Sequence, residues 1–203
     1  MTLKFHACLR TGLIVLSLFF VLFQGCKSSQ PTASGNNFLA PGYKKEDYKK
    51  ILVLALVKPE KNKKQMEDAI SGDLKDRRYP TVPAYKDFPE GSQIDTASFR
   101  KRVIEAGYDA AIVISYLGQI EKVQEHTQYD GTFFSIFYGY YSVIDVGTNM
   151  VGNAFFQVDF FTRDKVGTQW RAPIRVNTTN DLPLLLQMIA RNLRIQITGD
   201  NII

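Results

Sequence analysis

Residues 51–57 read ILVLALV, and this unbroken apolar run decides the fold of the chain. A run of this length is too short for a typical helix, and it is typical of a strand buried on both faces in the middle of a sheet. Residues 110–117, AAIVISYL, repeat the pattern after an intervening stretch of mixed polarity. We therefore expect two central strands, each covered by helices on both sides.

The stretch between the two runs predicts the connecting elements. Residues 62–78 carry apolar side chains at helical spacing, which indicates an amphipathic helix. A short strand is expected at residues 81–85. A second helix should begin with a cap at Asp95 or Thr96 and end at Gly107. Strand, helix, strand, helix, strand in this order is typical of right-handed crossovers in a parallel sheet.

The second half of the chain has a different pattern. Apolar and polar residues alternate over residues 156–161 and 169–176, which predicts an antiparallel hairpin with one buried face. Pro173 cannot donate to a ladder of hydrogen bonds, so its strand should be an edge strand or bulged there. A leucine-rich helix follows, with Thr179 or Asn180 as its cap.

Together these patterns predict an α/β (α+β) fold. It consists of a three-stranded βαβαβ core extended by an antiparallel hairpin, with three helices covering the sheet. The chain has 203 residues, of which 45% are hydrophobic and 22% charged. That composition fits one globular domain and excludes a chain that is disordered throughout.

The N-terminus has the features of an export signal. Lys4 and Arg10 precede an apolar stretch, Leu13–Phe23, that is shorter than the roughly 20 residues of a membrane-spanning helix. The residues up to Cys26 resemble the lipobox of bacterial lipoproteins, with Leu22 one position early. The resemblance implies cleavage before Cys26 and its modification by diacylglycerol and palmitate. A plain secretion signal and an uncleaved anchor remain the alternatives.

This interpretation divides the chain into three parts. Residues 1–25 are the expected signal peptide, residues 26–43 a lipid-anchored flexible tether rich in Ser, Pro, Gly and Asn, and residues 44–203 a single periplasmic domain. An aromatic-rich insertion is expected at residues 130–153. Because Cys8 leaves with the signal and Cys26 is lipidated, the mature chain should have no disulfide.

The basic residues do not point to a nucleic acid. The net charge is +5, and the visible cluster of Lys44, Lys45, Lys49 and Lys50 is interrupted by Glu46 and Asp47. We expect a solvated stretch leading into the domain, with weak attraction to anionic lipid as the alternative. The partners expected are the membrane, through the anchor, and an envelope protein.

Residues from Lys50 to Ile203 resemble a known class of envelope proteins. The opening KKILVLALV, the segment AGYDAAIVISYL and the hairpin FFTRDKVGTQWRAPIRV are similar to the periplasmic α/β domains of curli-secretion-type and TolB-N-terminal-like lipoproteins. The resemblance implies this fold and an envelope location. Lys27–Ser29 lack the aspartate of an inner-membrane retention signal, so we expect the periplasmic face of the outer membrane in a Gram-negative cell.

Residues 132–146, TFFSIFYGYYSVIDV, form the most unusual segment of the sequence. They could dock on a partner or on the membrane interface, because aromatic side chains suit surfaces that are half apolar and half wet. The alternative is that the rings pack beneath the sheet. The candidate binding residues are Phe133, Phe134, Phe137, Tyr138, Tyr140 and Tyr141.

No group of residues predicts catalysis. His126 has no second ligand at metal spacing, so we assign no metal and no cofactor. The carboxylate pairs, Glu121 with Glu125 and Asp145 with Asp159, have no feature that brings them together. Trp170 is expected in the core. We therefore expect a non-enzymatic envelope lipoprotein that serves as a binding or assembly module, with a subunit of an export or pore-forming assembly and a carboxylate-dependent hydrolase as alternatives.

Overall fold

The computed structural model describes residues 37–88, 96–118 and 152–203. Within these ranges the elements follow the predicted order, with one additional strand at the start. They are β1 (Phe38–Leu39), β2 (Ile51–Leu56), α2 (Glu60–Lys75), β3 (Thr81–Pro83), the 3₁₀ turn η1 (Ala84–Lys86), α3 (Thr96–Glu105), β4 (Ala110–Gly118), β5 (Asn153–Thr162), β6 (Trp170–Asn177) and α5 (Leu182–Gly199).

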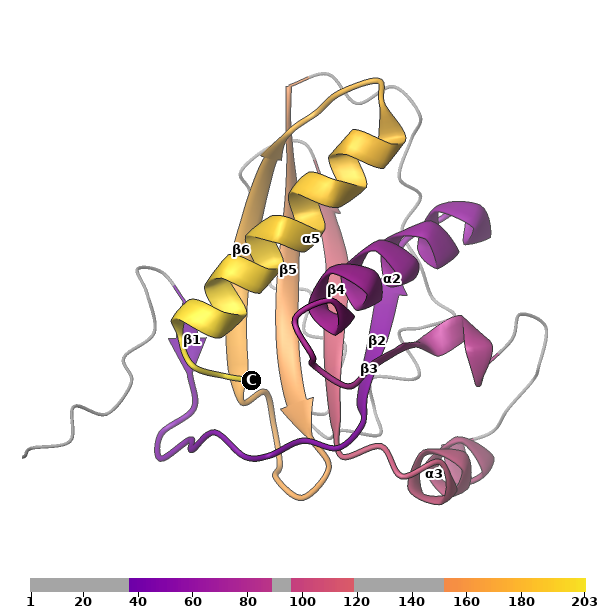
Figure 1. The fold of residues 1–203 in the computed structure, drawn as a ribbon, viewed down its shortest axis with the longest axis vertical. Coiled ribbons are helices and arrows are strands. Elements are labelled where there is room, and N and C mark those ends of the chain that lie inside the picture. The colour runs from indigo at the N-terminus through magenta and orange to yellow at the C-terminus, as the bar shows by residue number, and fades with distance from the viewer. Residues whose placement is uncertain (1–36, 89–95, 119–151) are drawn as a thin grey trace, which may run out of the picture. The chain divides into compact units, whose positions relative to one another are not determined.

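The strands form one six-stranded sheet in the order β1-β6-β5-β4-β2-β3 (Figure 1). β2 is parallel to β3 and to β4, and these three strands with α2 and α3 are the predicted βαβαβ core. β5 runs antiparallel to β4 and to β6, which places the predicted hairpin beside the core. The predicted α/β (α+β) class is therefore confirmed.

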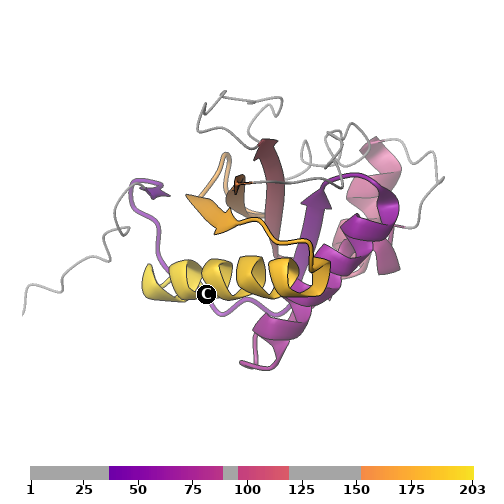
Figure 2. The ribbon, with the colours of Figure 1, turned by 90° about the horizontal axis from the view of Figure 1, so that it is seen from above.

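The two faces of the sheet carry separate cores. α2 and α5 cover the first face, and α3 lies on the opposite side of the sheet (Figure 2). The first face holds alternate residues of every long strand, among them Val53, Ile112 and Phe160. The second face holds the intervening residues, Leu54 and Val113 among them, packed against Val103 of α3. Strands β2 and β4 read as unbroken apolar runs because they are buried on both faces.

The hairpin has one fully buried face, as its alternation predicts. In β6, Trp170, Ala172, Ile174 and Val176 are buried, whereas the residues between them are partly or fully exposed. Pro173 lies in the part of β6 beyond its two-residue pairing with β1, where it needs no ladder donor. β6 as a whole is not the edge strand, because β1 pairs with Trp170 and Arg171, but residues 172–177 form an edge, as predicted for the region of Pro173.

The structure differs from the sequence prediction at three places. The strand expected at residues 81–85 ends at Pro83, because residues 84–86 form η1. Residues 38–43, assigned to the tether, are part of the fold, since β1 pairs with β6 and the Tyr43 side chain is buried. The cap of α5 is Asp181 rather than Thr179 or Asn180, because the Asp181 carboxylate accepts a hydrogen bond from the backbone N–H of Leu184 at 3.2 Å. None of the described helices combines the length and the apolar character needed to cross a bilayer.

Candidate functional site

Most of the residues singled out in the sequence lie outside the described ranges. This holds for Cys26, for the six aromatic residues of the insertion, and for Glu121, Glu125, His126 and Asp145. Trp170 is described and has no exposed surface, and its indole N–H donates to the Asp200 carboxylate at 2.7 Å. Its prediction as a core residue is confirmed.

Asp159 lies on the second face of β5 with a fully buried side chain. Arg171 Nε donates to one carboxylate oxygen at 2.5 Å, and Gln157 Nε2 donates to the other at 2.8 Å. Burial raises the pKa of the Asp159 carboxyl, and the nearby Arg171 guanidinium only partly opposes that effect. Because both of its oxygens accept hydrogen bonds and one donor is Arg171 of β6, this carboxylate links β5 to β6.

Two further buried carboxylates also link elements of the fold. Glu67 of α2 accepts hydrogen bonds from the backbone N–H of Ala55 at 3.1 Å and of Tyr85 at 2.9 Å. Asp200 accepts from the side-chain amide of Asn37 as well as from Trp170, so it holds β1 and β6 to the end of α5. Across residues 37–88, 96–118 and 152–203, no group of three or more His, Cys, Asp or Glu side chains could hold a metal ion.

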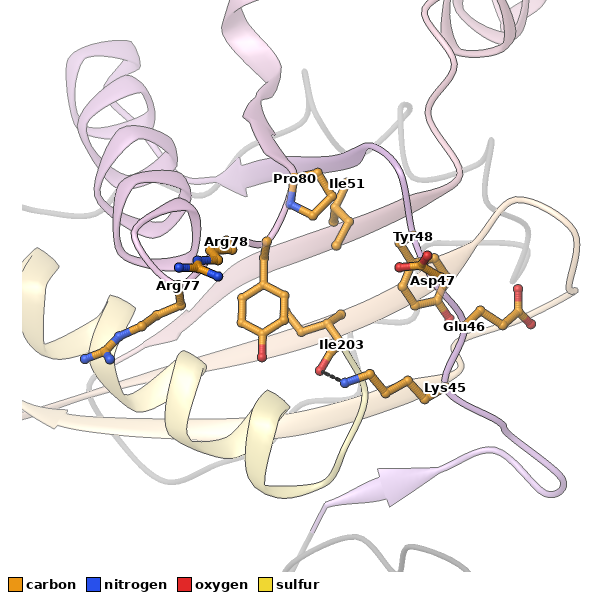
Figure 3. Close-up of a pocket in the computed structure, with 10 residues that line it drawn as sticks. Lys45, Glu46, Asp47, Tyr48, Ile51, Arg77, Arg78, Pro80 and Ile203 are labelled. Carbon is orange, nitrogen blue, oxygen red and sulfur yellow. Dashed lines mark hydrogen bonds between the residues drawn. The ribbon is translucent and has the colours of Figure 1, made fainter.

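A surface pocket is the candidate binding site in the described part of the chain (Figure 3). Its volume is about 290 Å³, close to the lower limit of pockets that hold small molecules. Three segments far apart in the sequence line it: residues 45–48 with Ile51, the connection from α2 to β3 at residues 77–80, and Ile203. The pocket therefore opens where β2 and β3 begin.

Residues 43–50, here called the strap, form one wall of this pocket. The Tyr43 hydroxyl donates to the backbone oxygen of Ile202 at 2.7 Å and lies 2.9 Å from the Tyr48 hydroxyl. Both rings meet Phe160 edge to face, with ring centroids 6.4 Å and 5.2 Å away. Burial raises the pKa of Tyr48 to about 12 and that of Tyr43 still further, so both hydroxyls keep their protons. The strap is thereby a fixed wall.

The opposite wall carries two adjacent arginines, Arg77 and Arg78, which are exposed. Arg78 has φ +71°, a left-handed position that usually belongs to glycine at the end of a helix. The turn is closed by hydrogen bonds from Arg78 N to Lys75 O and from Tyr79 N to Leu74 O. An L-residue in this conformation costs roughly 1–2 kcal/mol relative to glycine, so this helix end is strained.

The charges around the pocket are unequal. Lys45 Nζ donates to the backbone oxygen of Ile203 at 2.7 Å, as the dashed line in Figure 3 shows. The Glu46 carboxylate lies 2.6 Å from Lys165 Nζ, which neutralises it. Asp47 is the remaining acidic side chain of the lining. The lining therefore has three cationic side chains and, in the described part of the chain, one carboxylate without an ion-pair partner.

The sequence predicted the lysines of the strap as a solvated stretch, with weak attraction to anionic lipid as the alternative. It did not connect them with Arg77 and Arg78, since no local period relates the two segments. The available signal was the pair of arginines before Tyr79-Pro80, where a glycine would normally end the helix. Only the folded structure places Arg77 and Arg78 beside the strap.

Comparisons with known proteins give no family for the chain. No family model and no curated protein matches it. Among solved structures, a PelC dodecamer from Paraburkholderia phytofirmans has 7% identity and a TM-score of 0.45, covering 82% of this chain and 98% of that one. The lipoprotein GNA1162 from Neisseria meningitidis has 16% identity and a TM-score of 0.39, covering 74% and 96%. At such values the function rests on this chain's own residues, and the resemblance to curli-secretion-type and TolB-like lipoproteins stays a prediction.

Proposed function

We propose that this protein is a lipid-anchored lipoprotein of a bacterial envelope whose α/β domain is a non-enzymatic binding or assembly module. The observation that carries the proposal is the order of segments: basic residues, the apolar stretch Leu13–Phe23, Cys26, a short spacer and then a folded domain. A lipidated Cys26 would hold the domain at the membrane permanently, because two or three acyl chains bind almost irreversibly.

The tether that we propose is shorter than the one expected from the sequence, because residues 38–43 belong to the described fold. The described fold begins at Asn37, which leaves residues 27–36 as the spacer after Cys26. A flexible chain of that length has a root-mean-square reach of about 16–19 Å. The domain would therefore work close to the headgroups of its own leaflet.

The use of buried charge supports a non-enzymatic role. Glu67, Asp159 and Asp200 each accept hydrogen bonds that join separate elements of the fold. A general acid or base must instead present a free oxygen to a substrate. The three buried carboxylates of the described domain thus favour scaffolding over hydrolysis.

Metabolic labelling with a fatty acid tests the anchor. The wild type should incorporate the label, Cys26→Ser should not, and Cys8→Ser should retain it as the matched control, because Cys8 lies within the expected signal peptide. Label that persists in Cys26→Ser would refute lipidation at this residue.

For the location, we propose the periplasmic face of the outer membrane. The labelled protein should fractionate with the outer membrane and resist protease added to intact cells. Degradation in intact cells would place the domain on the outer surface and contradict this part of the proposal.

The partner is proposed to be an envelope protein, bound through the aromatic residues of the insertion. Replacing Phe133, Phe134, Tyr140 and Tyr141 together by Ser distinguishes docking from core packing. If the segment docks on a partner, the variant should keep its melting temperature within a few degrees of the wild-type value and should no longer co-purify with the partner. If the rings are core, each truncation costs about 3–5 kcal/mol and the domain unfolds, which would refute docking.

A further inference from the structure

We infer that the pocket between the strap and residues 77–80 binds the phosphate group of an anionic phospholipid headgroup. The inference deepens the proposed function and rests on it for the source of the ligand, because the anchor brings the domain to a lipid surface. Arg77 and Arg78 are the proposed phosphate ligands, and Lys45 adds positive charge at the opposite wall.

The two guanidinium groups are available for a ligand. Within the described part of the chain, no hydrogen bond or ion pair engages the side chain of Arg77 or Arg78, and both residues are exposed. A guanidinium presents several N–H donors in a planar fork that matches two phosphate oxygens. Both arginines line the same pocket, where either fork could bind a phosphodiester.

The backbone of Arg78 is a second, independent observation. The left-handed conformation at φ +71° would be relaxed by glycine, and an added side chain is a cost to folding. Strained positions of this kind concentrate at functional sites. An arginine at a position where glycine folds better is explained if its guanidinium has a ligand.

The charge and size of the pocket select the kind of ligand. With Glu46 held by Lys165, the lining has an excess of positive charge, which favours an anionic headgroup over a zwitterionic one. A volume of about 290 Å³ suits a headgroup rather than a long polymer segment. The acyl chains need no pocket because they stay in the bilayer.

The strap also relates the pocket to the membrane. It follows β1, whose first residue lies twelve positions after Cys26 in the sequence. A lipidated Cys26 would hold the domain, and with it the strap, at the membrane. Anionic headgroups would therefore be the most concentrated phosphate groups near the pocket.

Calorimetric titration tests the inference on the full acylated chain in a neutral detergent. The probes are glycerophosphoglycerol, which is the deacylated anionic headgroup, its zwitterionic counterpart glycerophosphocholine, and inorganic phosphate. We expect saturable binding of glycerophosphoglycerol, at least tenfold tighter than that of either other probe. Equal or tighter binding of inorganic phosphate would assign the pocket to free phosphate, and equal binding of glycerophosphocholine would remove the anionic selectivity. Either result overturns the lipid proposal, as does the absence of binding.

Two variants connect the binding to the pocket. Arg77→Gln with Arg78→Gln should weaken binding of glycerophosphoglycerol at least tenfold. Lys86→Gln with Arg191→Gln removes the same charge from exposed positions outside the pocket lining and should change the affinity less than twofold. Equal weakening by both double variants would show a general charge effect and overturn the site.

Arg78→Gly separates ligand binding from a structural role. It should raise the melting temperature without ligand, because glycine relaxes the left-handed position, and it should also weaken binding. A lower melting temperature with unchanged affinity would show that Arg78 only supports the fold. Binding by Cys26→Ser should equal that of the wild type, so loss of the fatty-acid label and loss of headgroup binding report separately on the anchor and on the pocket.

Discussion

The parallel half of the sheet, strands β2, β3 and β4, and its antiparallel half, strands β5 and β6, differ in how their two faces are covered. All six residues of β2 are buried, whereas in β6 buried residues alternate with partly or fully exposed ones. The parallel half is covered by α2 on one side and by α3 with η1 on the other. The antiparallel half has α5 on its first face, and its second face carries Arg171, Pro173 and Arg175. The comparison shows that helix cover, rather than strand propensity, decides how apolar a strand must be.

The largest effect is expected on the first face, which both halves share. Phe160→Ala removes a ring without exposed surface that contacts Tyr43 and Tyr48 of the strap. We expect a loss of about 3–5 kcal/mol in the free energy of unfolding, measured by denaturant titration. Phe38→Ala, at a side chain with 47% exposure, is the control and should cost far less. Equal losses would contradict a continuous first-face core.

On the second face of the parallel half, Leu54→Ala should cost about 2–5 kcal/mol of unfolding free energy. The side chain is 1% exposed and packs in the cluster beneath α3. A cost below about 1 kcal/mol would mean that the second face of the parallel half is not a packed core, and the contrast between the halves would fail.

Within the antiparallel half, where Asp159 of β5 meets Arg171 of β6, Arg171→Met should cost about 1–3 kcal/mol, because it leaves the buried Asp159 carboxylate without its cation. Met preserves most of the apolar stem of the side chain. The double variant with Asp159→Asn should recover part of the loss, since the uncompensated charge is gone. No recovery in the double variant would contradict the coupling.

The pH dependence of stability tests the same ion pair of the antiparallel half. Burial raises the pKa of Asp159 in the folded state above its unfolded value of about 3.9. The folded state therefore binds the proton more tightly, and lowering the pH through the folded pKa stabilises the wild type relative to Asp159→Asn. The difference in melting temperature between the two proteins should grow in favour of the wild type from pH 7 toward pH about 4.5. A difference that shrinks would mean that Arg171 and Gln157 outweigh burial.

The smallest effect is expected on the second face of the antiparallel half. Arg175 is exposed, and its guanidinium lies 5.5 Å from the centroid of the Phe155 ring. Arg175→Ala should change the free energy of unfolding by no more than about 0.5–1 kcal/mol, measured by the same titration. A loss as large as that of Leu54→Ala would show that both halves are packed alike on this face.

The sequence alone was sufficient for the elements whose patterns are local. The apolar runs at residues 51–57 and 110–117 predicted β2 and β4, helical spacing predicted α2 and α5, and alternation predicted the hairpin with its one buried face. These predictions succeed because backbone geometry imposes a period on each buried face, and a few consecutive residues suffice to show it.

Only the tertiary structure decided which distant residues meet. β1 is two residues long, so it has no period of its own and exists because β6 offers it an edge. Tyr43 is buried because its hydroxyl finds the backbone of Ile202, and Asp159 is paired because the register places Arg171 opposite it. The pocket likewise needs the strap, the end of α2 and Ile203 together. Contacts of this kind leave no period in the sequence, since they depend on how complete elements pack against one another.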